Sequence, residues 1–376
     1  MEGFEKATTK SLLEHFSEVE DFRASWRVAY PMPEILLLVV CATIASCDDF
    51  EDIEEWGVAH LDFLRRLLPY DNGIPGARWL NILMNRINPD LFSDCFMAWA
   101  TSFRSSLSPQ IAIDGKTLRR SHDDSTGKSA LHLVSAFATH ERLILGQEAT
   151  ADKSNEITAI PILLERLARK GALAGSLVTI DAMGCNPRVT QSVLDHKADY
   201  LIGLKGNQQN LLHDVEAFFN HTCLSFDTHT EHDKGHGRIE ERTVRVSTDV
   251  AHIKTEKLPH IAAIACVDCR VEKKGRVSQE RRYYISSRTM TASGFLDAIR
   301  IHWQIENSLH WVLDVAFKDD LSRVRKGHGA KNMAVVRHFA LNLVRRAKDK
   351  KSVKVRRKRA GWDPDYLYSL LVNPDS

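Results

Sequence analysis

The sequence predicts a mixed α/β fold preceded by a helical domain, and three observations lead to this prediction. Residues 1–107 hold successive segments with the three- and four-residue apolar spacing of helices. In residues 108–224, short apolar runs alternate with such helical segments, which is the order expected where helices cover a sheet. Residues 225–290 hold mainly strand-like runs with polar connections, which we interpret as a β-rich insertion.

The N-terminal domain, residues 1–107, is predicted to contain several short helices separated by prolines and a glycine-containing turn. Its longest apolar run, Ile35–Cys47, has 13 residues, whereas a bilayer span needs roughly 20. We therefore interpret this run as a buried helix and expect no membrane attachment. The predicted helices are residues 11–19, 33–47, 50–68 and 89–103, and residues 105–110 are interpreted as a linker.

A sheet covered by helices is predicted from residue 110 onward. Helices return after the β-rich insertion, so the α/β core is expected to comprise residues 108–224 and 291–348. The predicted strands are residues 110–114, 131–139, 142–150, 176–182 and 198–205, of which the second and third form a hairpin. The predicted helices are residues 154–171, capped by Ser154 or Asn155, and residues 187–198, 207–221, 294–315 and 331–348.

The net charge of +2 conceals an asymmetry along the chain. Residues 1–62 carry 14 acidic and 4 basic side chains, a net of −10, whereas residues 345–359 carry 10 basic and 1 acidic, a net of +9. Such a basic run favours contact with a polyanion, and the alternative is a solvated tail; we assign residues 349–376 to a basic C-terminal tail. The seven cysteines are scattered and odd in number, which indicates a reduced, cytoplasmic protein.

Three carboxylates stand out from the apolar pattern. Asp114 and Asp181 each end an apolar strand, and ligands of open α/β sheets bind at such ends. Glu306 falls on the apolar stripe of its predicted helix, three residues after Trp303 and seven before Leu313. A carboxylate on a buried face is costly unless it is paired or bound to metal. Three such groups at one point repel each other unless a cation is present, and hard oxygen ligands suit Mg²⁺ or Mn²⁺.

Six segments of the chain carry a family resemblance. They are IAIDGKTLRRS (111–121), VTIDAMGC (178–185), ADYLIGLKGNQ (198–208), GHGRIEER (235–242), IRIHWQIENSLHWVLDVAFKDDLSRVR (299–325) and AGWDPDYL (360–367). Together and in this order they resemble the DDE transposases of bacterial insertion sequences, and most closely the H-repeat-associated group linked to Rhs elements. The resemblance covers essentially the whole chain. It implies a ribonuclease H-like catalytic core, interrupted by a β-rich insertion before the last acidic helix.

The resemblance implies that Asp114, Asp181 and Glu306 are the catalytic DDE triad. They would hold two divalent ions, Mg²⁺ or Mn²⁺, about 3.5–4 Å apart, with Asp114 bridging both. The implied reaction is phosphoryl transfer on DNA: a nick at each inverted-repeat end frees a 3′-hydroxyl, which then attacks target DNA. Joining two ends implies at least a homodimer in the working complex. It also implies a cytoplasmic protein that is associated with the nucleoid when bound to DNA.

Basic and polar residues near the triad are candidate DNA contacts. Ile299, His302 and Leu313 stand where related transposases have Tyr, Arg and Lys, and His302 and Arg300 are candidates to replace that DNA grip. For the basic residues that follow Asp114 the alternative is a plain surface charge, and for Asn207 it is a helix N-cap. Affinity from such contacts falls steeply with salt. The full set is Lys116, Arg119, Arg120, Lys205, Asn207, Arg238, Arg300, His302, Arg323 and Arg325.

Three histidine or cysteine patterns have a zinc interpretation as an alternative. The C-x-x-C pair at residues 266–269 is interpreted as two half-buried cysteines, because a zinc site needs a second pair. Residues 223–236, with one cysteine and three histidines, are interpreted as a polar loop. His302, Glu306 and His310 share a helix face and could bind zinc, but that leaves the two strand-end aspartates unexplained.

The remaining side chains of the acidic helix are given structural roles. We expect Trp303 and Trp311 to pack in the core, Asp319 and Asp320 to be exposed, and Asp314 to support the site. Two functions are considered beside an active transposase. One is a catalytically idle, transposase-derived DNA-binding protein, and the other is a metal-dependent DNA nuclease without strand transfer. Matched inverted repeats around the gene favour the transposase.

Overall fold

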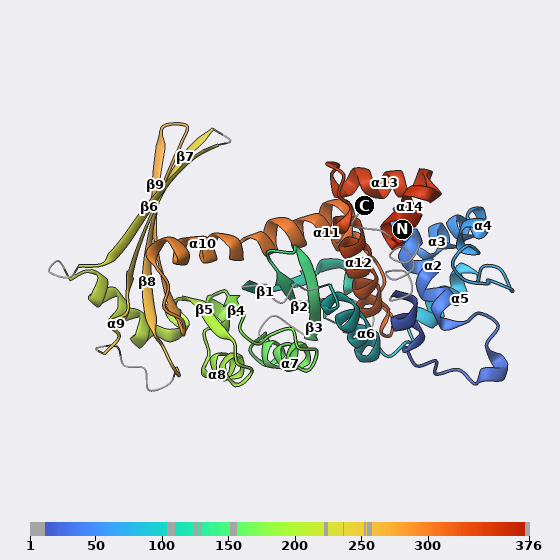
Figure 1. Ribbon diagram of the computed structural model, residues 1–376, viewed down its shortest axis with the longest axis horizontal. Coiled ribbons are helices and arrows are strands. Elements are labelled where there is room, and N and C mark those ends of the chain that lie inside the picture. Colours follow the sequence, from blue (N-terminus) through green and yellow to red (C-terminus); the bar gives the residue numbers. More distant parts are fainter. Residues whose placement is uncertain are drawn as a thin grey trace.

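A nine-stranded mixed sheet forms the spine of the molecule, in the order β3-β2-β1-β4-β5-β9-β8-β7-β6 (Figure 1). The computed structural model describes residues 12–372, apart from residues 104–109, 123–126, 128, 151–155, 222–224, 236, 252 and 254–257. The predicted mixed α/β fold with a helical N-terminal part is confirmed. The strands are β1 Gln110–Leu118, β2 Leu131–Ala138, β3 Leu143–Thr150, β4 Leu177–Ile180, β5 Asp199–Leu204, β6 Asp227–Gly235, β7 Arg238–Ser247, β8 Ala263–Lys273 and β9 Arg276–Ser286.

Helices of the N-terminal part precede the sheet, and the others alternate with its strands or follow it. The first group is α2 Met32–Ile44, α3 Phe50–Ala59, α4 Leu61–Leu64, α5 Ala77–Met84 and α6 Pro89–Thr101. The second is α7 Glu156–Arg169, α8 Pro187–Asp195, α9 Gln209–Phe219, α10 Ala292–His302, α11 Trp311–Ala316, α12 Gly329–Arg346, α13 Val353–Trp362 and α14 Pro364–Val372. Within the described residues, no helix combines the length and the apolar character needed to span a membrane.

Strand β1 has an antiparallel neighbour on one side and a parallel neighbour on the other. It pairs with β2 in the predicted β2–β3 hairpin, and with β4, which is itself parallel to β5. In the β1–β4 ladder, Ile113 pairs with Ile180. The two residues that follow, Asp114 and Asp181, therefore lie at the same edge of the sheet, as the strand-end pattern predicts.

Strands β6–β9 prolong the same sheet beyond β5. Strand β9 pairs antiparallel with β5, and the other three follow in turn as a long ribbon that projects past the helices (Figure 1). Strand β6 was interpreted as a polar loop from the sequence. It is a strand whose side chains are mostly exposed, so it lacks the apolar alternation that reveals a half-buried strand.

Helix α12 is the centre of the core that joins the helical part to the sheet. Nearly all of its residues are buried, and it packs against α2 and α6 on one side and β3 on the other. Phe339 lies at the middle of an aromatic cluster, with ring centroids 4.9 Å from those of both Phe96 and Trp99. Because this contact is extensive and apolar, the N-terminal helices are fixed against the sheet.

The predicted basic tail folds as two helices, α13 and α14, that pack against α2 and α12. Two of its arginines are buried. Arg357 donates to the carbonyl oxygen of Thr43 at 2.8 Å, and its guanidinium lies 3.9 Å from the ring centroid of Phe317. Arg356 donates to the carbonyl oxygen of Val344 at 2.8 Å. These two arginines therefore serve packing, because buried guanidinium groups need such partners. The predicted linker before Gln110 and the predicted caps Ser154 and Asn155 lie outside the described residues.

We predict that Asn342→Leu destabilises the fold, because its amide covers the open edge of the sheet. The Asn342 side chain accepts from the N–H of Ile144 at 3.0 Å and donates to its carbonyl at 2.9 Å. Leucine leaves both buried backbone groups unpaired, at a cost of about 2–4 kcal/mol. Urea unfolding measures the loss. The exposed Asn210→Ala is the control, with an expected change within about 0.5 kcal/mol. Equal stabilities contradict this role of Asn342.

Candidate active site

Asp114 and Asp181 are brought together by the pairing of the strands that carry them. Asp114 lies within β1, and Asp181 follows β4 directly and caps the turn after it. The Oδ1 atom of Asp181 accepts from the backbone N–H of Met183 at 3.0 Å. One carboxylate is thus held by a strand and the other by a short capped turn, so the backbone fixes both.

The two carboxylates perturb each other electrostatically. Burial raises the pKa of Asp181, and the negative charges of Asp114 and Glu156 raise it further. Burial also raises the pKa of Asp114, but the nearby imidazole of His310 outweighs this, so its net pKa is lowered. Repelling carboxylates in a poorly solvated site are the ligand type that a hard divalent cation neutralises. The pair therefore fits the predicted Mg²⁺ or Mn²⁺ site.

Glu306 is not on the buried face of its helix, contrary to the prediction. It is exposed and lies in a π-helical segment, Ile305–His310, between α10 and α11. A π turn takes in one more residue than an α turn, so the α-helical period places residues wrongly across it. The buried stripe is Ile305, Leu309 and Leu313. Trp303 and Trp311, predicted as core residues, lie off this stripe and are 43% and 60% exposed.

The structure therefore assembles two members of the triad and leaves the third in solvent. Among the described residues, no three histidine, cysteine, aspartate or glutamate side chains gather closely enough to hold a metal ion. The carboxylate near Asp181 that the sequence analysis missed is Glu156, the first residue of α7. It is buried and paired with His132 at 2.6 Å. The only sequence signal for this pair is Gly115, where a Cβ would collide with both side chains.

Two histidines flank the aspartates. The Nδ1 atom of His302 lies 2.9 Å from the hydroxyl of Thr179, and burial lowers the pKa of His302. The Nε2 atom of His310 lies 3.2 Å from Oδ2 of Asp114, outside hydrogen-bond geometry. The sequence signal for them is their eight-residue spacing, which places both on the helix face of Glu306, and the sequence analysis considers it only as a zinc alternative.

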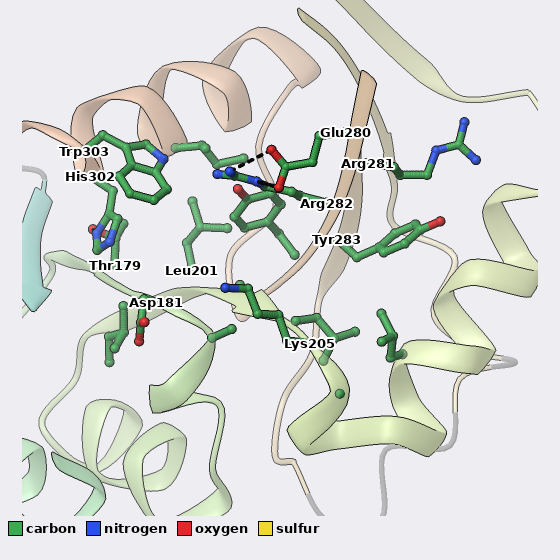
Figure 2. Close-up of a pocket in the computed structure, with 18 of the residues that line it drawn as sticks. Thr179, Asp181, Leu201, Lys205, Glu280, Arg281, Arg282, Tyr283, His302 and Trp303 are labelled. Carbon is green, nitrogen blue, oxygen red and sulfur yellow. Dashed lines mark hydrogen bonds and ion pairs between the residues drawn. The ribbon is translucent and has the colours of Figure 1, made fainter. Parts of the chain in front are cut away.

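A cavity of about 450 Å³ opens beside Asp181 (Figure 2). Its walls come from β9, the end of α10 and the loop after β5, and Lys205 points into it. Arg282 is paired with Glu280 at 2.7 Å, and its guanidinium lies 5.4 Å from the ring centroid of Trp303. The cavity thus combines cationic and aromatic side chains next to an acidic site, as nucleic-acid interfaces do.

The predicted DNA contacts divide into exposed and internally paired side chains. Lys116 is buried, its ammonium paired with Asp314 and Asp319. The amide of Asn207 donates to the carbonyl of Ala182 at 2.8 Å, and Gln208 rather than Asn207 caps α9. Arg238 lies 3.2 Å from Glu240, Arg300 is paired with Glu231, and Arg325 donates to the carbonyl of Arg120 at 3.1 Å. Arg119, Arg120, Lys205 and Arg323 are exposed, and Arg119 lies 3.4 Å from Asp320.

The predicted exposure of Asp319 is wrong, since its side chain is 4% exposed. Its two oxygens contact Lys116 at 3.1 Å and Arg337 at 3.0 Å, and a buried carboxylate requires such partners. Of the C-x-x-C pair on β8, Cys269 is half-buried, as predicted for both cysteines, whereas Cys266 is fully buried. Of the other zinc alternative, Cys223 and His236 lie outside the described residues.

Comparison with known proteins identifies the family. Residues 13–100 match the family model described as DDE_Tnp_1-associated, and residues 105–343 match the one described as Transposase DDE domain. The chain belongs to the DDE transposase family, as the resemblance predicted.

Similar proteins include relatives in Escherichia coli and one solved structure. The H repeat-associated protein YhhI of Escherichia coli K12 is 38% identical over 375 residues, covering 96% of this chain and 98% of YhhI. YbfQ of the same strain, described as an inactive transposase, is 46% identical over 66 residues, 18% of this chain and 79% of YbfQ. A solved piggyBac transposase synaptic complex with hairpin DNA has a TM-score of 0.44 and 11% identity, covering 98% of this chain and 78% of that one.

We predict that Asn207→Ala loosens the turn after Asp181. Its amide holds the carbonyl of Ala182, within that turn. Loss of a hydrogen bond worth about 1 kcal/mol raises opening of the turn about fivefold. Amide hydrogen exchange of residues 183–185 measures this, with the exposed Gln209→Ala as control. Unchanged exchange in Asn207→Ala contradicts this role.

Proposed function

We propose that the protein is a DNA transposase that cleaves and transfers strands by metal-dependent phosphoryl transfer. Asp114, Asp181 and Glu306 are its catalytic carboxylates. The observation that carries the proposal is the convergence of Asp114 and Asp181, each of which directly follows the last paired residue of the parallel β1–β4 ladder. Family membership supports the same chemistry.

We infer that the five strands β3-β2-β1-β4-β5 form a ribonuclease H-like core. Three strands in antiparallel pairing are followed by two more in parallel pairing, with helices in the connections. In this arrangement β6–β9 are the insertion, and the helical stretch after β9 returns Glu306 to the core. The proposed domains are residues 1–107, the core of residues 108–224 and 291–348, the insertion 225–290 and the C-terminal 349–376.

Asp114, Asp181 and Glu306 would hold the Mg²⁺ or Mn²⁺ ions. Bound there, two such ions supply Lewis-acid stabilisation of the attacking and leaving oxygens. Because Glu306 is exposed, its side chain and the π-helical turn that carries it have to reorient toward the aspartates when the ions bind, while α11 keeps its contacts with β1. Its π-helical segment suits this change, since π turns interrupt regular helices at functional sites.

The cationic side chains around the site position DNA. Lys205 points into the cavity beside Asp181. There its positive charge can pair with a phosphate that approaches the carboxylates. The exposed Arg119, Arg120 and Arg323 extend the positive surface along the backbone of the inverted-repeat end. Cleavage frees a 3′-hydroxyl that attacks target DNA, and two ends require at least a homodimer. The protein works in the cytoplasm, at the nucleoid.

A catalytically idle DNA-binding relative is the second candidate. The exposed position of Glu306 favours it, because two aspartates alone give an incomplete triad. A nuclease without strand transfer is separated from a transposase by its products, since only the transposase joins the freed 3′-end to a second DNA.

We predict that Asp114→Asn, Asp181→Asn and Glu306→Gln each abolish Mg²⁺-dependent cleavage of inverted-repeat DNA. Each removes a ligand whose charge stabilises the transition state, so the rate falls at least about a thousandfold. DNA binding persists, because these side chains carry no positive charge. Gel-based cleavage and binding assays measure both effects.

The exposed Asp297→Asn on α10 is the matched control and is expected to cleave normally. Cleavage by any of the three triad variants at the wild-type rate contradicts the assignment of that residue. A wild-type chain that binds these ends but never cuts them supports the idle relative.

A further inference from the structure

Lys116 occupies an unusual place for a predicted phosphate contact. It lies on β1 two residues after Asp114, so both side chains are on the same face of the strand. Only 12% of the Lys116 side chain is exposed. Its ammonium is paired with Asp314 and lies 3.1 Å from Oδ2 of Asp319. A side chain held in this way has little freedom to reach a phosphate.

The two acidic partners of Lys116 belong to the chain segment that carries Glu306. Asp314 lies in α11, eight residues after Glu306 in the same continuous helical stretch. Asp319 lies in the short turn of helix directly after α11. Its second oxygen lies 3.0 Å from Nη1 of Arg337 on α12. Lys116 therefore joins the strand of Asp114 to the helix of Glu306, and Arg337 anchors the same cluster to the core.

The cluster is electrically balanced. Two cations, Lys116 and Arg337, face two carboxylates, Asp314 and Asp319, and all except Asp314 are nearly buried. Buried charges persist where each has a partner and good geometry. The lowered pKa of Asp319 agrees with this, because the charges of Arg337 and Lys116 outweigh the opposing effect of burial.

The side chain of Glu306 is exposed, so its position is set by the helical backbone that carries it. Two contacts join that backbone to β1. One is the approach of His310 to Asp114 at 3.2 Å, one helical turn after Glu306. The other is the pairing of Lys116 with Asp314, which lies eight residues after Glu306, and with Asp319, which lies just beyond the end of α11. The second link is the stronger one, since it joins full charges away from bulk water.

We propose that Lys116 is a positioning residue, which holds the helix of Glu306 against the strand of Asp114 and so sets the spacing of the metal-binding carboxylates. This role rests on the proposed metal-dependent function. Lys116 acts through Asp314 and Asp319 and makes no phosphate contact. In this proposal the lysine supports the position of the acidic triad without touching the substrate.

Lys116→Met tests the proposal against the phosphate-contact alternative. Loss of an outer partner of a metal site lowers metal affinity by about 10- to 100-fold. We therefore expect weaker Mn²⁺ binding to the DNA-free protein, and an equal rise in the Mg²⁺ concentration that gives half-maximal cleavage. DNA affinity and its salt dependence stay at wild-type values. Mn²⁺ titration followed by electron paramagnetic resonance, and DNA titrations at several salt concentrations, measure these quantities.

Lys205→Met is the matched control, because Lys205 is an exposed lysine beside Asp181. It is expected to show the opposite pattern: unchanged Mn²⁺ binding, weaker DNA binding, and a salt slope reduced by about one. If Lys116→Met behaves like Lys205→Met, then Lys116 contacts phosphate and the proposal is overturned.

Asp314→Asn keeps the test decisive if Lys116→Met fails to fold. Asp314 is 34% exposed, and its replacement leaves Lys116 paired with Asp319. The same loss of Mn²⁺ affinity with intact DNA binding is expected, and wild-type Mn²⁺ affinity in Asp314→Asn overturns the proposal. A wild-type chain that binds Mn²⁺ but never cleaves DNA contradicts the proposed function and leaves the role of Lys116 standing. A wild-type chain that binds no Mn²⁺ contradicts both.

Discussion

The parallel pairing of β1 with β4 is the constraint on which the candidate site depends. It places Asp114 and Asp181 at one edge of the sheet, where their charges repel and where burial makes that repulsion costly. We propose that a divalent cation offsets this repulsion. Two contacts join the neighbouring helical stretch to the same strand. His310 lies 3.2 Å from Asp114, and Lys116 is paired with Asp314.

The elements that were predicted correctly are those whose burial produces a recognisable apolar pattern in the sequence. The runs that end in Asp114 and Asp181 are buried central strands, so both appear as unbroken apolar stretches before an acidic residue. The β2–β3 hairpin and helix α7 were predicted for the same reason. Two of the three predicted triad residues could therefore be placed at one sheet edge from the residues alone. Glu306 was also singled out from the residues, but by a buried position that the structure does not confirm.

The elements that were missed lack such an apolar pattern. Strand β6 is fully exposed on one face and only partly covered on the other, and its residues are polar, so nothing in its composition separates it from a loop. The outward position of Glu306 depends on a π turn, which no periodicity reveals. The basic residues Arg357 and Lys116 were interpreted as surface charges or DNA contacts, because the partners that bury them lie far away in the sequence.

A crystal structure of the protein with Mn²⁺ and inverted-repeat DNA tests the central claim most directly. Anomalous scattering locates the ions without prior assumptions about their ligands. The account predicts ions held by oxygens of Asp114, Asp181 and Glu306, with Glu306 turned inward from its exposed position. Ions held by Asp181 and Glu156, or no ion at Asp114 and Asp181 when DNA is bound, would contradict it.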